Sequence, residues 1–124
     1  MRCKRMFVHG VCCAALLLGA CASVDPDHAQ GQRVPIAPFA AHETCRHLEP
    51  GDRWSYRFSA SSPVSFSIHY RAGPAVISPI ERDDVREDAA VFPSALAEDY
   101  CMTWQAGRSG ALLDYDARVI RAPR

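Results

Sequence analysis

Apolar and polar residues alternate along two stretches near the middle of the chain, and such alternation places the apolar side chains of a strand on one face. Ser61-Ser62-Pro63 lies between the two stretches and indicates a break in the chain direction. The pattern predicts an antiparallel hairpin of two half-buried strands, over residues 53–59 and 64–71. Its apolar face comprises Trp54, Tyr56, Phe58, Val64, Phe66, Ile68 and Tyr70.

Shorter strand patterns surround this hairpin, with turns predicted at Pro50-Gly51 and between Gly107 and Gly110. The charged run 81–88 is predicted to be a solvated loop or a short helical turn, and 94–98 one turn of helix. The expected fold is all-β: a small antiparallel β-sandwich of about seven strands. The remaining strands are predicted over residues 44–48, 75–77, 89–92, 100–104 and 111–121.

The start of the chain has the pattern of a secretory signal. Arg2, Lys4 and Arg5 precede an apolar run over residues 11–20. This run is shorter than the roughly 20 residues that a membrane-spanning helix needs, so a permanent transmembrane anchor is not expected.

The cleavage region Leu18-Gly19-Ala20-Cys21 resembles the lipobox of bacterial lipoproteins. The resemblance implies cleavage before Cys21 and lipidation of its sulfur, and two or more acyl chains give stable anchoring. An ordinary secretory signal with a chance cysteine is the alternative. Ala22 and Ser23 follow, without the aspartate of the inner-membrane retention signal. We therefore expect a location on the outer membrane facing the periplasm, with the inner-membrane outer leaflet or the cell surface as alternatives.

The predicted organisation has three parts. Residues 1–20 form the lipoprotein signal peptide, 21–38 the lipidated cysteine and a flexible tether, and 39–124 the β-sandwich domain. The tether prediction rests on scattered prolines and polar residues without strand or helix periodicity. Phe39 is expected to dock onto the domain.

Six cysteines are present, of which three lie in the predicted signal and a fourth is Cys21. This leaves Cys45 and Cys101. An even pair in an exported protein predicts a disulfide, which would tie the two ends of the domain together. Two free thiols or a redox pair are the alternatives.

The charge balance argues against nucleic acid as a partner. Cleavage before Cys21 removes three of the 14 Lys and Arg residues and none of the 14 Asp and Glu residues, which leaves a net charge of about −3. Nucleic acids and anionic membrane surfaces attract basic proteins. The membrane contact expected here is therefore the lipid anchor itself.

Several motifs together resemble the GOLD-type (Golgi dynamics) β-sandwich. They are Cys45, Pro50-Gly51, the aromatic stretch 54–58, the V-x-F-x-I pattern at 64–68, Tyr100-Cys101 and the stretch 115–119. The resemblance covers about residues 44–120 and departs from the family at Asp99, where a glycine is usual. It implies a non-catalytic recognition module that binds proteins or lipids.

Candidate chemistry is sparse, and no catalytic residue, metal site or cofactor is expected. His42 and His47 lie five residues apart, whereas zinc-binding histidines four apart share a helical face. The serine-rich stretch 59–67 has no nucleophile-elbow motif. We therefore expect a protein that is not an enzyme, although a small hydrolase remains a third hypothesis.

One polar face offers candidate binding residues. His69 projects from it, Arg71 is beside it, and Arg57 is expected on the neighbouring strand. Imidazole and guanidinium groups together suit an anion or carboxylate, whereas a plain solvated sheet face is the alternative. The first functional hypothesis is an envelope lipoprotein whose sandwich docks a partner protein. The second is a small-ligand or metal-binding periplasmic lipoprotein that uses the face around His69 and Arg71.

Overall fold

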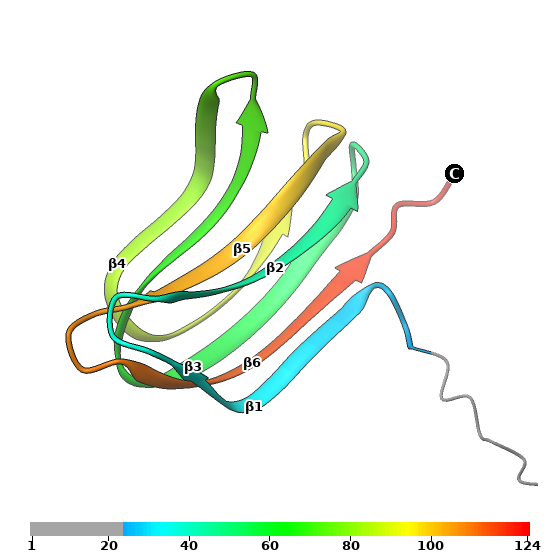
Figure 1. Cartoon of the computed structure of the whole chain (residues 1–124). Helices are drawn as coiled ribbons and strands as arrows, with labels where there is room; N and C mark the ends of the chain where they lie inside the picture. Colours follow the sequence, from blue (N-terminus) through cyan, green and yellow to red (C-terminus); the bar gives the residue numbers. More distant parts are fainter. Residues whose placement is uncertain (1–23) are drawn as a thin grey trace, which may run out of the picture.

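The computed structural model describes residues 24–124, so the predicted signal peptide and the lipidation site Cys21 lie outside the described residues. The described chain is all-β, with six strands in one antiparallel sheet that curls on itself (Figure 1). Within residues 24–124 no helix is long and apolar enough to cross a membrane. The strands are β1 (His28–Ile36), β2 (Ala41–Leu48), β3 (Arg53–Ala72), β4 (Ala75–Pro93), β5 (Glu98–Ala106) and β6 (Ala111–Ile120).

The long strand β3 runs through both layers of the sandwich. Its first half, residues 53–60, pairs with β6, and its second half, residues 64–69, pairs with β5. β1 extends the sheet beyond β6 and β2 extends it beyond β5. We call β1, β6 and the first half of β3 the β6 layer, and β2, β5 and the second half of β3 the β5 layer. β4 follows the other side of β3 through both layers.

Aromatic side chains of the two layers meet in the core. The ring of Phe58 in the β6 layer lies 4.8 Å from that of Phe66 and 5.9 Å from that of Trp104, both in the β5 layer. Trp54 and Leu113 are also buried. The predicted apolar face of residues 53–71 therefore forms the core, as the alternation indicated.

The predicted hairpin between residues 53–59 and 64–71 is wrong, because both stretches belong to β3. Ser61-Ser62-Pro63 bends the strand rather than ending it, and the register with β4 shifts between Ser59 and Val64. Proline is tolerated at such an irregularity, where the ladder already lacks a hydrogen bond. In the described residues, a hairpin joins β3 to β4 through Gly73-Pro74, with Gly73 at a φ of 60°.

The charged run 81–88 is also a strand, so the loop or helical turn predicted there is wrong. It forms the middle of β4, and the strands predicted at 75–77 and 89–92 are the two ends of that element. One side of β4 pairs with β3 and the other pairs with no described strand. Charged side chains on an edge strand oppose pairing with other chains. Residues 94–97 are a loop, not the predicted helical turn.

The flexible tether predicted over residues 21–38 is wrong for His28–Ile36, which form β1 against β6. A bulge between Gly31 and Val34, with Arg33 at a φ of 49°, hides the alternation. β1 is an edge strand, so it tolerates Pro35. Merging four predicted strands into two and adding β1 gives six strands rather than seven.

Candidate functional site

The predicted disulfide between Cys45 and Cys101 is confirmed. The two cysteines lie directly opposite each other on β2 and β5, with their Cα atoms 4.1 Å apart. The bond joins the edge strand of the β5 layer to its neighbour and lies on the outer face of that layer, with Cys45 exposed. It therefore links neighbouring strands of one layer rather than the two ends of the domain.

Four polar side chains gather around the disulfide on the outer face of the β5 layer. We call Glu43, Ser67, His69 and Thr103 the outer cluster. Thr103 Oγ1 donates a hydrogen bond to Glu43 Oε2 at 2.9 Å, and Ser67 Oγ lies 3.2 Å from His69 Nδ1. His69 Nε2 is 4.0 Å from Glu43 Oε2. The imidazole thus lies between a hydroxyl and a carboxylate.

The outer cluster brings a serine and a histidine within hydrogen-bond distance, which the hydrolase hypothesis requires. Acyl transfer also needs N–H groups free to stabilise an oxyanion. The strand at Ser67 is paired on both sides, opposite Glu81 of β4 and Thr103 of β5. Backbone N–H groups at Ser67 therefore form hydrogen bonds within the sheet. The geometry suits a Ser67 hydroxyl that orients the His69 imidazole better than one that takes part in acyl transfer.

The three residues predicted as one ligand face do not come together. His69 lies on the outer face of the β5 layer, whereas Arg57 lies in the β6 layer. Both project outwards by strand parity, but β3 passes from one layer to the other, so their side chains lie on opposite sides of the molecule. Arg71 is exposed two residues beyond His69, near the turn into β4. The expectation that Arg57 lies on a neighbouring strand is wrong.

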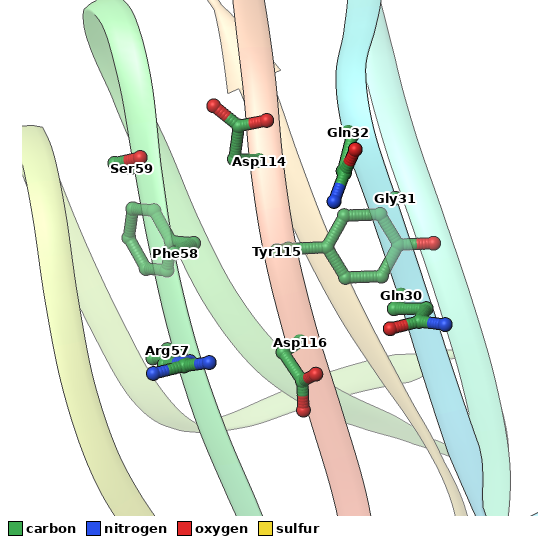
Figure 2. Close-up of a pocket in the computed structure, with 9 residues that line it drawn as sticks. All are labelled: Gln30, Gly31, Gln32, Arg57, Phe58, Ser59, Asp114, Tyr115 and Asp116. Carbon is green, nitrogen blue, oxygen red and sulfur yellow. The ribbon is translucent and has the colours of Figure 1, made fainter.

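Arg57 instead lines a hollow on the β6 layer, with a volume of about 470 Å³ (Figure 2). Arg57 is directly opposite Asp116 of β6, and Asp116 is opposite Gln30 of β1. On the outer face of this layer the hollow therefore combines a guanidinium, carboxylates, amides and a hydroxyl, whereas the rings of Phe58 and Tyr115 pack inwards against Trp104. Its lining comprises Gln30, Gly31, Gln32, Arg57, Phe58, Ser59, Asp114, Tyr115 and Asp116.

The bulge in β1 shapes this hollow. Arg33 N donates to Asp114 Oδ1 at 2.8 Å and fixes the bulge against β6. A Cβ on Gly31 would lie 2.7 Å from Tyr115 Cε1 and 2.6 Å from Val34 Cγ2, so only glycine fits beneath that ring. Burial raises the pKa of Tyr115, whose hydroxyl lies 3.1 Å from His42 Nε2 on β2. The side chain of Tyr115 therefore connects β6 to the other edge strand, β2, through the interior of the sandwich.

An ion-pair network around the buried carboxylate of Asp52 closes one end of the sandwich, and sequence reasoning missed it. Asp52 is fully buried and accepts hydrogen bonds from Ala122 N, Glu49 N and Arg121 Nη1. These contacts, with the Ala122 bond first, lower the pKa of Asp52 to about 2. The hydrogen bonds between Arg121 and Asp27 raise the pKa of the guanidinium and lower the pKa of the carboxyl group. The partners are far apart in sequence, so no local motif marks them.

No protein-family model matches this chain, and no curated protein matches it at a significant level.

Proposed function

We propose that this protein is a lipid-anchored lipoprotein of the bacterial envelope, and that its β-sandwich is a non-catalytic module that binds a partner protein. The lipobox-like sequence ending at Cys21 supports the anchor. The resemblance to the GOLD-type sandwich supports a recognition role. The observation that carries the proposal is an exposed aromatic residue with a hydrogen-bonded backbone, Phe39, at one end of the molecule.

The position of β1 determines how the anchored domain would face the membrane. Six residues separate Cys21 from His28, and six extended residues span at most about 20 Å. The start of β1 and the C-terminus lie at the same end of the sandwich, and the β1–β2 and β5–β6 loops lie at the other (Figure 1). The anchor would hold the first end close to the lipid and direct the two loops away from it.

Phe39 is the exposed aromatic residue at the membrane-distal end. Its side chain is 67% exposed, so the expectation that it docks onto the domain is wrong. Its backbone, however, is fixed: its N–H donates to Gly107 O at 3.2 Å, and its carbonyl accepts from Gln105 Nε2 at 3.4 Å. Phe39 has a φ of 60°, a conformation that bulky residues rarely adopt and that is typical of functional positions.

An exposed aromatic side chain on a hydrogen-bonded backbone suits a protein interface, because it can bury a large apolar area and has only two side-chain torsions to restrict on binding. Leu112 at the start of β6 adds apolar surface and is 38% exposed. We therefore assign the partner-binding surface to the end of the sandwich that bears the β1–β2 and β5–β6 loops.

Photo-crosslinking in living cells tests this assignment. A photoreactive residue at position 39 is expected to give a discrete adduct with another envelope protein. The matched control position is Leu96, an apolar residue that is 49% exposed in the β4–β5 loop at the other end. Equal adducts at both positions, or no adduct at position 39 in correctly anchored protein, would show that the distal end is not the binding surface.

The anchor is tested separately. Cys21→Ser is expected to abolish incorporation of labelled palmitate and to leave the uncleaved precursor in the membrane fraction. Unchanged processing and no acyl mass on the wild-type chain would contradict lipidation.

The hollow around Arg57 supports a second candidate function, the binding of a small polar ligand. Its amides, carboxylates and guanidinium suit a ligand rich in hydroxyl groups. The candidate ligand site therefore lies on the β6 layer, and not on the predicted face around His69 and Arg71. Titration of isotope-labelled protein with simple sugars should shift the amide signals of Gln30 and Arg57 if the hollow binds them. Signals that stay unchanged would exclude sugar binding there.

A further inference from the structure

We propose that the residues around the Cys45–Cys101 bond form a zinc site when that bond is reduced. His69, Cys101 and Cys45 form one row across β3, β5 and β2, because His69 is opposite Cys101 and Cys101 is opposite Cys45. Glu43 projects from the same face of β2, two residues before Cys45. Reduction would therefore provide two thiolates, one imidazole and one carboxylate on adjoining strands.

The distances suit a tetrahedral metal ion. One ligand atom each of Glu43, His69 and Cys101 lie within 4.8 Å of one another. With Zn–S bonds of about 2.3 Å and Zn–N or Zn–O bonds of about 2.0 Å, the ligand atoms of a tetrahedral site lie about 3.3–3.8 Å apart. The proposed site therefore requires side-chain rotations that bring these atoms about 1 Å closer together. Thiolate and imidazole ligands favour zinc over magnesium or calcium, which prefer oxygen.

Two hydroxyl groups already orient the ligands. Ser67 Oγ lies 3.2 Å from His69 Nδ1, so a proton on Nδ1 leaves Nε2 free to bind a metal. Thr103 Oγ1 donates to Glu43 Oε2 and fixes the carboxylate beside the imidazole. Such outer contacts set the tautomer and the angle of metal ligands in proteins and are worth about tenfold or more in affinity. The outer cluster has this arrangement around the disulfide.

A dithiol can act as the reductant of the Cys45–Cys101 disulfide. One thiolate of the dithiol attacks the sulfur of Cys45, which is exposed. The Cys45–Cys101 bond breaks, Cys101 leaves as a thiolate, and a mixed disulfide joins Cys45 to the dithiol. The second sulfur of the dithiol then attacks the first and releases Cys45. The dithiol becomes a disulfide, and Cys45 and Cys101 each become a thiol. Zinc then binds both as thiolates and releases two protons. The metal would join β2 to β5 in place of the covalent bond, so the edge strand stays attached in both redox states.

Cobalt(II), a spectroscopic substitute for zinc, tests the site in the mature lipidated chain held in detergent, in which Cys45 and Cys101 are the cysteines left to bind a metal. We expect one cobalt ion per chain after treatment with a phosphine reductant, with a thiolate-to-cobalt charge-transfer band and the strong visible bands of tetrahedral coordination. Zinc should displace the cobalt and remove these bands. Before reduction, we expect no such bands. Equal binding before and after reduction would overturn the proposal, because the sulfurs could not then be ligands.

Variants test whether His69 and Glu43 are ligands, or whether the two cysteine thiols bind the metal without them. His69→Ala and Glu43→Gln are each expected to lower cobalt affinity by about tenfold or more and to alter the visible bands. His47→Ala is the matched control, because His47 lies on the same strand as Glu43 and pairs instead with Asp99 and Glu49. Circular dichroism of the reduced chain reports whether the sheet persists. If the reduced chain unfolds, or if His69→Ala binds cobalt like the wild type, the proposed site is wrong.

Discussion

The guanidinium of Arg121 forms two hydrogen bonds with the carboxylate of Asp27, at 2.8 and 3.1 Å. The same guanidinium donates to Asp52 Oδ2 and to the carbonyl of His47, each at 2.9 Å. One side chain beyond β6 thus holds the turn before β1, the end of β2 and the turn before β3. This network fixes the end of the sandwich at which β1 begins and β6 ends.

Loss of Arg121 should strongly destabilise the domain. Arg121→Met removes the closest cationic partner of the buried Asp52 carboxylate, and because the guanidinium is partly exposed we expect a loss of about 1–3 kcal/mol. Urea denaturation should show a lower midpoint. Arg108→Met, on the exposed β5–β6 loop, is the control and should change stability by less than about 0.5 kcal/mol. Similar midpoints for both variants would mean that the network contributes nothing measurable.

Stability should fall at acidic pH because of Asp52. Its pKa is about 2 in the folded protein and near 3.8 in the unfolded chain. As the pH falls, the unfolded chain therefore takes up this proton first. The difference corresponds to about 2 kcal/mol that is fully present above pH 4 and is lost as the pH falls to about 2. The urea midpoint of Asp52→Asn should therefore depend less on pH across this range than the midpoint of the wild type. An equal dependence on pH in both proteins would contradict the assignment.

Gly31 should not tolerate a side chain. Gly31→Ala forces the new Cβ against Tyr115 and Val34 at under 3 Å, and such overpacking costs about 1–3 kcal/mol. Thermal unfolding should show a lower midpoint. A Cβ on Gly107 meets nothing within 4 Å, so Gly107→Ala should unfold close to the wild type. If the two variants unfold alike, the ring of Tyr115 does not lie on Gly31 in solution.

Removal of the disulfide should destabilise the oxidised protein. The bond closes a loop between residues 56 apart, for which the chain-entropy model gives about 4 kcal/mol. The double variant Cys45→Ala/Cys101→Ala, measured in chelator-treated buffer so that metal binding plays no part, should unfold at much lower urea concentration. A midpoint equal to that of the oxidised wild type would show that hydrogen bonding between β2 and β5 suffices.

Local patterns predicted much of the fold. The alternation around Trp54 and Phe66 marked the core face correctly, because a buried sheet face requires every second residue to be apolar wherever the strand lies. Pro50-Gly51 predicted its turn because Gly51 readily adopts its φ of 91°. The disulfide was found by elimination among six cysteines, which needs no spatial information.

The errors share one physical cause. Alternation shows which face of a strand is buried, but not whether two stretches are one bent strand or two strands. The bend at Ser61–Pro63 and the charged middle of β4 were therefore misassigned. The bulge at Gly31–Val34 broke the alternation that would have revealed β1.

The sequence by itself determined the all-β class, the core face, the disulfide pair and the lipobox-like pattern, since each depends on residue type and short-range spacing. Only the tertiary structure placed Arg57 and His69 on opposite layers, joined Arg121 to Asp27, and set Glu43 beside His69. These relationships depend on which strands pair and where β3 bends. Pairing is decided by the packing of the whole core, to which residues distant in sequence contribute together.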